Sequence, residues 1–357
     1  MVIDVHCHVG LSARRVLTLA QRFSFEAHGA EGRPGFDSYL SPRLLGRFAW
    51  RFIKRWLGVG ATAESGDALD AHIETMNEQH FATPRIDRFV LLAFDEYRDD
   101  QARVIGSAAK GLRLGSDVYV SNSFVKSMCL TRPDKFLFGA SIHPYRPGAT
   151  AMLEEVAASG AVLVKWLPIH QNIRAEDPRT VAFLRKAAEL RIPMLIHYGG
   201  EMSLARQHME FESPVPMLDI LRQLRSEGRM PTVIVAHAAT PSFIWQSRAG
   251  HDALVDALLG EFADAPLYAD ISALSALGRS PWLRRLAVRR ELHRKLVWGS
   301  DFPIPVMLRS LSLRIPRAER HRIAAIASWI EQSMETARWA GYDDCVFTQA
   351  ANILRIS

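Results

Sequence analysis

Eight short apolar runs, rich in valine, isoleucine and leucine, recur along the chain with helix-patterned segments between them. Parallel β/α units produce this alternation, because a strand must be followed by a crossover, usually a helix, before the next parallel strand can begin. Eight such units are the number that closes a (β/α)8 barrel. We therefore predict an α/β fold, a TIM barrel, with strands near 2–8, 88–94, 136–142, 161–167, 193–197, 231–236, 266–271 and 295–300.

Signals for helix ends support the segments between the runs. Asp177 places a capping side chain before Pro178, which suits the first helical position, and Gly160 and Gly228 stand where a helix end needs a residue that tolerates positive φ. The pattern predicts helices over 68–80, a segment within 102–129, 149–159, 178–191, 215–227, 250–263, 281–293 and about 320–340.

Two histidines separated by one residue, His6 and His8, end the first run. Successive side chains of a strand alternate between its two faces, so both imidazoles point the same way while Cys7 points into the opposite layer. Two neutral imidazoles on one face suit a zinc-like ion, although a single pair is a weak signal.

Residues of metal-binding or catalytic type also end later runs. In a barrel the carboxyl ends of all strands meet at one mouth, where active sites of this fold are assembled. Taken alone, each of these residues is more simply explained as a hydrogen-bonded structural residue or a turn cap, and it is their joint placement that favours a site. They are His143, Lys165, His197, His237 and Asp301.

The 357 residues, 48% of them hydrophobic, can form one large core and exceed what a bare barrel needs, which is about 250 residues. We therefore expect one domain over 1–357 with an insertion at about 11–67, far longer than the usual loop between a strand and its helix. By topology this insertion lies at the catalytic mouth.

The insertion carries an apolar stripe beside an arginine stripe. A basic amphipathic helix near 43–57 can lie on a membrane surface; we favour a lid-like helix that packs its aromatic stripe on the barrel rim or on a second subunit, which would make the protein a homo-oligomer. Its arginines could also select an anionic substrate. The apolar stripe is Leu45, Phe48, Phe52 and Trp56, and the basic one is Arg43, Arg47, Arg51 and Arg55.

Composition excludes several classes of protein. No stretch approaches the roughly 20 apolar residues of a membrane span, and the first ten residues read as a strand and not as a secretory leader. Three cysteines without close pairing suit a reducing compartment, so we expect a cytoplasmic protein. A net charge of +6 permits nonspecific attraction to nucleic acid, but no nucleic-acid motif is present. The expected partner is a small-molecule substrate.

With these residues in place, the whole chain resembles the amidohydrolase superfamily, in its amidohydrolase-related branch of metal-dependent hydrolases and aminocarboxymuconate semialdehyde decarboxylase-like enzymes. The resemblance implies a (β/α)8 barrel with His6, His8, His197 and Asp301 around a divalent metal. It implies for His237 either a second-metal ligand or a catalytic acid/base. The motifs that carry it are IDVHCH, GASIHP, VKWLP, LIHYGGE, VIVAHA, WGSDFP and the closing VFTQAANILRI, with Asn352.

Two interpretations of Lys165 stay open. In binuclear members of the superfamily a carboxylated lysine at the end of strand four bridges two metals, and Lys165 lies at that position. A free ammonium beside a dication would be repelled. Otherwise Lys165 remains an ordinary lysine that binds a substrate carboxylate or pairs with an acid such as Glu201.

The ligand set predicts hydrolysis of an amide, lactone or ester carbonyl, in a small carboxylate-bearing substrate, by a metal-activated water. A divalent ion lowers the pKa of bound water toward about 7; Asp301 can take the proton, and His237 can polarise the carbonyl or stabilise the oxyanion. Zinc is the expected ion, with manganese, iron and nickel also compatible. A nonoxidative decarboxylase of an aromatic or enoic acid is the alternative. A non-catalytic metal-binding protein would need an incomplete ligand set.

Four polar residues, His143 among them, have less certain places at the mouth. His143 could contact substrate or cap its loop, and Tyr198 and Glu201 follow His197 closely enough to bind substrate, although Glu201 could instead begin a helix or pair with a basic residue. Asp270 is polar within an apolar run and could bond a ligand or satisfy a turn.

Overall fold

The structure is a computed structural model. It describes residues 1–14, 17–27, 36–47, 50–51, 54–55, 58–59, 66–106, 114–243, 245–276, 278–310 and 313–356.

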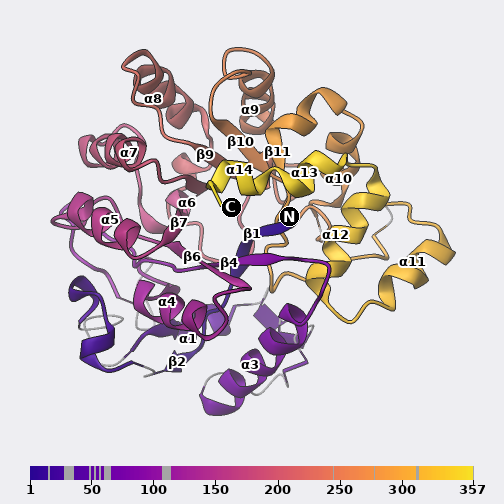
Figure 1. The fold of residues 1–357 in the computed structure, drawn as a ribbon, viewed down its shortest axis with the longest axis horizontal. Coiled ribbons are helices and arrows are strands. Elements are labelled where there is room, and N and C mark those ends of the chain that lie inside the picture. The colour runs from indigo at the N-terminus through magenta and orange to yellow at the C-terminus, as the bar shows by residue number, and fades with distance from the viewer. Residues whose placement is uncertain are drawn as a thin grey trace.

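Eight parallel strands form one curled sheet, the TIM barrel that the apolar runs predict (Figure 1). Neighbouring strands pair in the order of the chain, so each unit packs beside the previous one. The sheet closes where the first strand meets the segment after the last, through bonds from Asp301 N to His6 O (2.9 Å) and from His8 N to Phe302 O (2.8 Å). The strands are β1 (Ile3–His8), β4 (Arg88–Leu92), β6 (Phe136–Ala140), β7 (Ala161–Trp166), β8 (Met194–His197), β9 (Val233–Ala236), β10 (Leu267–Asp270) and β11 (Leu296–Val297).

Helices surround the strands on the outside of the barrel (Figure 1). The expected end signals are confirmed: the Asp177 side chain accepts a bond from Arg179 N (2.9 Å), and Gly160 and Gly228 have φ values of 92° and 67°. The helices between strands are α3 (Asp67–Phe81), α4 (Asn122–Thr131), α5 (Ala149–Ala158), α6 (Pro168–Gln171), α7 (Pro178–Leu190), α8 (Val215–Ser226), α9 (Ala249–Leu259) and α10 (Ser280–Ala287).

Two of the expected helices are divided. The helix expected over 281–293 ends at Ala287, and a 3-10 helix over Arg290–Lys295 follows it. The stretch expected over 320–340 consists of α11 (Arg317–Ala324) and α12 (Trp329–Ala340), because the Ser328 side chain accepts a bond from Glu331 N and so begins a new helix. The chain closes with α13 (Asp344–Thr348) and α14 (Ala350–Leu354), which contains Asn352.

Strand alternation divides the core into two layers. Inward side chains such as Val5 and Leu163 fill the barrel, while outward side chains such as Trp166 pack against helices, with Trp166 and Phe183 ring centroids 5.0 Å apart. Lys165, the neighbour of Trp166, therefore points inward, as the alternation predicts, and is only 2% exposed.

The segment after β1 contributes to a second, smaller sheet. Strand β3 (Ser38–Leu40) is the middle strand and pairs antiparallel with β2 (Ala13–Arg14) on one side and with β5 (Val118–Val120) on the other. In the chain β5 lies between β4 and α4. A short helix, α1 (Pro42–Leu45), follows β3. The buried Glu26 carboxylate ties this segment to the start of α4 by accepting bonds from Asn122 N (2.7 Å) and Ser123 N (2.8 Å). The division of the chain into a barrel and a lid-like insertion remains our proposal.

The expected stripes in the insertion are only partly visible. Leu45 is buried, whereas Phe48, Phe52 and Trp56 lie outside the described residues. Arg43 and Arg47 approach Asp117, at 2.6 and 3.8 Å between nitrogen and oxygen. Within the described ranges the structure contains no helix with the length and apolarity needed to cross a membrane.

Candidate metal centre

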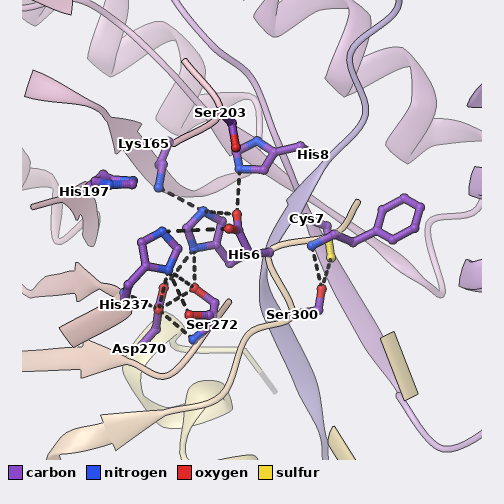
Figure 2. A network of polar contacts seen from close by, with 12 residues as sticks. His6, Cys7, His8, Lys165, His197, Ser203, His237, Asp270, Ser272 and Ser300 are labelled. Carbon is purple, nitrogen blue, oxygen red and sulfur yellow. Dashed lines mark hydrogen bonds and ion pairs between the residues drawn. The ribbon is translucent and has the colours of Figure 1, made fainter. Parts of the chain in front are cut away.

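His6 and His8, the two histidines of β1, belong to one network of polar contacts (Figure 2). Both face the carboxylate of Asp301, which follows β11. His6 Nε2 lies 3.3 Å and His8 Nε2 lies 3.2 Å from Asp301 Oδ1, and the three atoms lie within 4.8 Å of one another. His6 is buried and the His8 side chain is 30% exposed, so the group opens toward solvent on the His8 side.

The backbone around Asp301 explains why its carboxylate reaches β1. Asp301 has φ of 60°, an unusual conformation for a residue with a side chain, and its N–H donates to His6 O. Gly299 permits this close approach, because a Cβ there would lie 2.9 Å from the Cβ of His6. The WGSDFP motif thus fixes the carboxylate beside the two imidazoles.

Asp270, the last residue of β10, and Ser272, two residues later, orient His6. His6 Nδ1 donates to Asp270 Oδ2 at 2.9 Å, and Ser272 Oγ lies 3.0 Å from the same nitrogen. The lone pair of His6 is therefore on Nε2, the atom that faces Asp301. A carboxylate behind a metal-binding histidine has this effect in metal sites generally.

His237 lies beside the same group, at the end of β9. Its Nδ1 lies 2.9 Å from Ser272 O; a carbonyl oxygen only accepts, so Nδ1 carries the proton and Nε2 carries the lone pair. His237 Nε2 is 3.9 Å from Asp301 Oδ2. The ring stacks on His6 with centroids 5.2 Å apart.

Lys165 reaches the centre from β7. Its Nζ donates to His6 Nε2 at 3.0 Å, so the lysine uses the lone pair that a cation would need. Burial lowers the pKa of Lys165 to about 8, although the nearby carboxylates of Asp270 and Asp301 act in the opposite direction. A cation and the protonated amine cannot both occupy this lone pair.

His197 lies at the end of β8, beside His237, with ring centroids 4.6 Å apart. Its Nε2 lies 3.3 Å from Gly200 O and 3.6 Å from Glu201 Oε2. His197 is thus next to the His6, His8 and Asp301 group without being part of its cluster of donor atoms. Glu201 Oε1 also accepts from Leu204 N at 2.9 Å, which fixes the loop after β8.

Two further predicted residues lie apart from the cavity at the mouth. His143 is fully buried; its Nε2 donates to Gln171 O (2.7 Å) and its Nδ1 accepts from Tyr145 N (3.1 Å). Tyr198 is 3% exposed and belongs to the hydrophobic core. Neither residue lines the cavity.

Sequence reasoning gave too little weight to three residues. Asp270 was a candidate only for a ligand bond or a turn, yet it holds His6; its polarity within an apolar strand was the available signal. Ser272 and Arg279 had no signal, since their roles depend on residues distant in sequence. Arg279 is 6% exposed and donates to Gly200 O, behind the loop that carries Glu201.

The electrostatics of the centre favour neutral imidazoles beside an ionised carboxylate. Burial lowers the pKa values of His6, His197 and His237. For Asp301, burial raises the pKa, but the electrostatic interaction with the His6 ring and the hydrogen bond from His8 outweigh it, so the pKa lies well below its usual value. Neutral imidazole and ionised carboxylate are the forms that bind metals.

These observations test whether the residues suit a divalent ion. Two imidazole nitrogens and one carboxylate oxygen converge, and a carboxylate holds His6 in the tautomer that frees Nε2. Two further histidines, His197 and His237, adjoin them. Nitrogen and oxygen donors of this kind suit zinc and other first-row ions. The donor set fits a metal.

A cavity that opens to solvent lies over this centre. It has two parts that differ in chemistry. The floor consists of His8, Lys165, His197, Glu201, His237 and Asp301. The wall is largely apolar and includes Leu40, Leu44, Trp50, Leu69, Ile73, Met76, Phe94, Val118, Val120, Leu167, Leu204, Phe302 and Ile304.

Solved structures share the fold. An uncharacterised TIM-barrel protein from Bordetella bronchiseptica has 16% sequence identity and a TM-score of 0.53, over 99% of this chain and 98% of that one. A probable 2-pyrone-4,6-dicarboxylic acid hydrolase from Acinetobacter baumannii, solved with citric acid bound, has 14% identity and a TM-score of 0.51, over 99% of both chains. No curated protein sequence matches the chain.

A family model described as Amidohydrolase matches residues 3–324, from the first strand through α11. The match includes β1 with its two histidines, the ends of β7, β8 and β9, and Asp301 after β11. The chain therefore belongs to the amidohydrolase family.

Proposed function

We propose that this protein is a metal-dependent hydrolase that cleaves an amide, lactone or ester carbonyl. The observation that carries the proposal is the convergence of His6 Nε2, His8 Nε2 and Asp301 Oδ1 under an open cavity. His6, His8, His197 and Asp301 would hold one divalent ion, with zinc as the expected ion. Such an ion polarises a carbonyl and lowers the pKa of a bound water toward about 7.

Asp301 is the base in this proposal. Its carboxylate is ionised at neutral pH, faces the cavity, and has His237 Nε2 3.9 Å from Oδ2. It can therefore take a proton from the attacking water and return it to the leaving group.

His237 acts as a second proton acceptor rather than as a neutral donor to the oxyanion. Because Ser272 O holds the Nδ1 proton, Nε2 of His237, a residue that lines the cavity, carries a lone pair. The ring must first gain a proton before it can donate one from this nitrogen. Proton transfer between Asp301 and His237 would then let either group protonate the leaving group.

Lys165 supplies the positive charge of the floor. It is the only lysine or arginine that lines the cavity in the part of the chain that the structure describes. We propose that it keeps its amine and binds an anionic oxygen of the substrate. Among the described residues two groups of possible metal ligands share His6, one with His8 and Asp301 and one with His237 and Asp270. We place the single ion in the first group, because His8 and Asp301 line the cavity, whereas Asp270 does not line it and accepts from His6 Nδ1. In this single-ion site no bridging lysine is needed.

The test is turnover of the zinc-loaded full chain with panels of lactones, N-acyl compounds and aromatic acids in isotopically labelled water. We expect one heavy oxygen in the product carboxylate. Carbon dioxide release without incorporation would replace this proposal with nonoxidative decarboxylation. Absence of turnover on every panel, with the ion bound, would contradict both reactions.

A further inference from the structure

The cavity wall is built from segments distant in sequence that all contribute apolar side chains. Leu44 and Trp50 come from the insertion, Ile73 and Met76 from α3, and Val118 from β5. Such a wall excludes water from whatever it contacts, because it offers few groups to hydrogen-bond. The floor, in contrast, is made of charged and imidazole side chains.

Hydrogen bonds hold two of the insertion's wall residues in place. Trp50 Nε1 donates to Ser203 O at 3.0 Å, which ties the insertion to the loop after β8. Leu44 N donates to Ser41 Oγ at 2.9 Å, which caps α1 and fixes the side chain that follows. The wall is therefore a built surface: Trp50 ties the insertion to the loop after β8, and the cap of α1 holds Leu44 within the insertion.

The insertion's positive charges that the structure describes do not line the cavity. Arg43 and Arg47 approach the buried carboxylate of Asp117, which also accepts from Ala205 N at 2.9 Å. Arg51 and Arg55 are exposed and are not lining residues. A second anionic group on a substrate would thus meet apolar side chains and no countercharge from these four arginines.

We infer that the substrate has one polar end, which the floor binds, and an extended apolar body, which the wall binds. The ligand class is a monocarboxylic acid or acyl compound with an aliphatic or aromatic chain, as opposed to a small dicarboxylate. Each methylene moved from water into such a wall strengthens binding by about fourfold. A charged group in the same place weakens binding, since it loses its hydration without gaining a partner. This inference refines the substrate of the proposed hydrolase and depends on that proposal only for the reaction.

Calorimetric titration of the zinc-loaded full chain with butanoate, hexanoate, octanoate and hexanedioate tests it. Affinity should rise along the first three by on the order of 100-fold in total, and hexanoate should bind at least about tenfold more tightly than hexanedioate. Equal affinities along the series, or tighter binding of hexanedioate, would overturn the inference. These measurements need no variant, so they hold even if a variant fails to fold.

A matched pair of variants locates the effect on the wall. Ile73→Glu adds a charge to a half-buried position of the wall, whereas Ile220→Glu adds one to a half-buried position of α8 that does not line the cavity. The ratio of octanoate to butanoate affinity should fall by at least about tenfold in the first variant and stay unchanged in the second. Loss of the ratio in both, or in neither, would contradict the wall as the binding surface.

The two proposals can fail separately. If octanoate binds selectively but no carbonyl substrate is turned over, the proposed hydrolysis is contradicted and the proposed ligand class stands. If short polar substrates are hydrolysed and chain length has no effect on affinity, the proposed ligand class is contradicted and the proposed hydrolysis stands.

Discussion

The floor and the wall of the cavity differ in how their residues are held. Floor residues such as His237 and Asp301 follow barrel strands, and directional bonds to Ser272 O and His6 O fix them. Wall residues such as Leu44 and Ile73 come from the insertion and α3 and contribute undirected apolar contact. The comparison suggests that the barrel sets the chemistry and that the added segments set the substrate.

The largest effect should come from changing the floor at Asp301. Asp301→Asn removes the base and the negative charge of one metal ligand. We therefore expect kcat to fall by at least about 1000-fold while most bound metal is retained. Steady-state kinetics and elemental analysis on the same sample measure both. Asp264→Asn, at a carboxylate whose side chain is 79% exposed, is the control and should keep full activity. A fully active Asp301→Asn protein would remove the proposed role.

A change behind the floor should have a smaller effect. Asp270→Asn keeps the shape of the side chain but weakens its hold on His6 Nδ1, from which Oδ2 accepts at 2.9 Å. Loss of such a partner should weaken metal binding by about 10–100-fold. A competition titration with a zinc chelator measures this change. Unaltered zinc affinity would show that His6 needs no orienting carboxylate.

A change that loosens the wall should spare the floor. Asp117→Asn leaves Arg43 and Arg47 without their carboxylate and weakens the contact to Ala205 N. We expect the free energy of unfolding to fall by about 2 kcal/mol, and octanoate to bind less tightly, while zinc affinity stays the same. Denaturant unfolding and two titrations test this. A parallel loss of zinc affinity would mean that wall and floor are not separable.

The smallest effect should come from His143, which lies in neither part. Burial lowers its pKa to about 3, and its Nδ1 accepts from Tyr145 N, so a proton there would oppose an N–H group. The unfolded chain binds a proton near pH 6.5. Its contribution to stability is therefore complete above pH 6.5 and is lost as the pH falls toward 3.

His143→Gln should accordingly flatten the decline of unfolding free energy between pH 6.5 and 3 and leave KM unchanged at neutral pH. Thermal unfolding across this pH range, with kinetics at pH 7, measures both. A raised KM with unaltered stability would contradict this structural role and would indicate that His143 binds substrate.

Much of the barrel could be predicted because its signals are local. A strand such as β7 shows its apolar period and its end within a few residues, and alternation then decides that Lys165 points inward and Trp166 outward. The convergence of His6, His8 and Asp301 followed once the fold was assumed, since parallel strands share one mouth.

What could not be predicted depends on contacts between distant segments. The role of Asp270 behind His6 joins residues 264 positions apart, and the bond from Arg279 to Gly200 joins residues 79 apart. The hydrogen bond from His143 to Gln171 O could not be predicted either, because the orientation of a loop side chain depends on the neighbouring loop that packs on it. The cavity wall could not be predicted because it depends on the path that the insertion takes over the barrel. The hydrophobic periodicity of the sequence does not determine that path.

The central claim is that imidazoles and one carboxylate from distant strands bind a single cation, and metal stoichiometry tests it most directly. Elemental analysis of the full chain, dialysed after zinc loading, should find one ion per chain, and His6→Ala combined with His8→Ala should find none. A wild-type protein without stoichiometric metal, or a double variant that keeps its ion, would contradict the account.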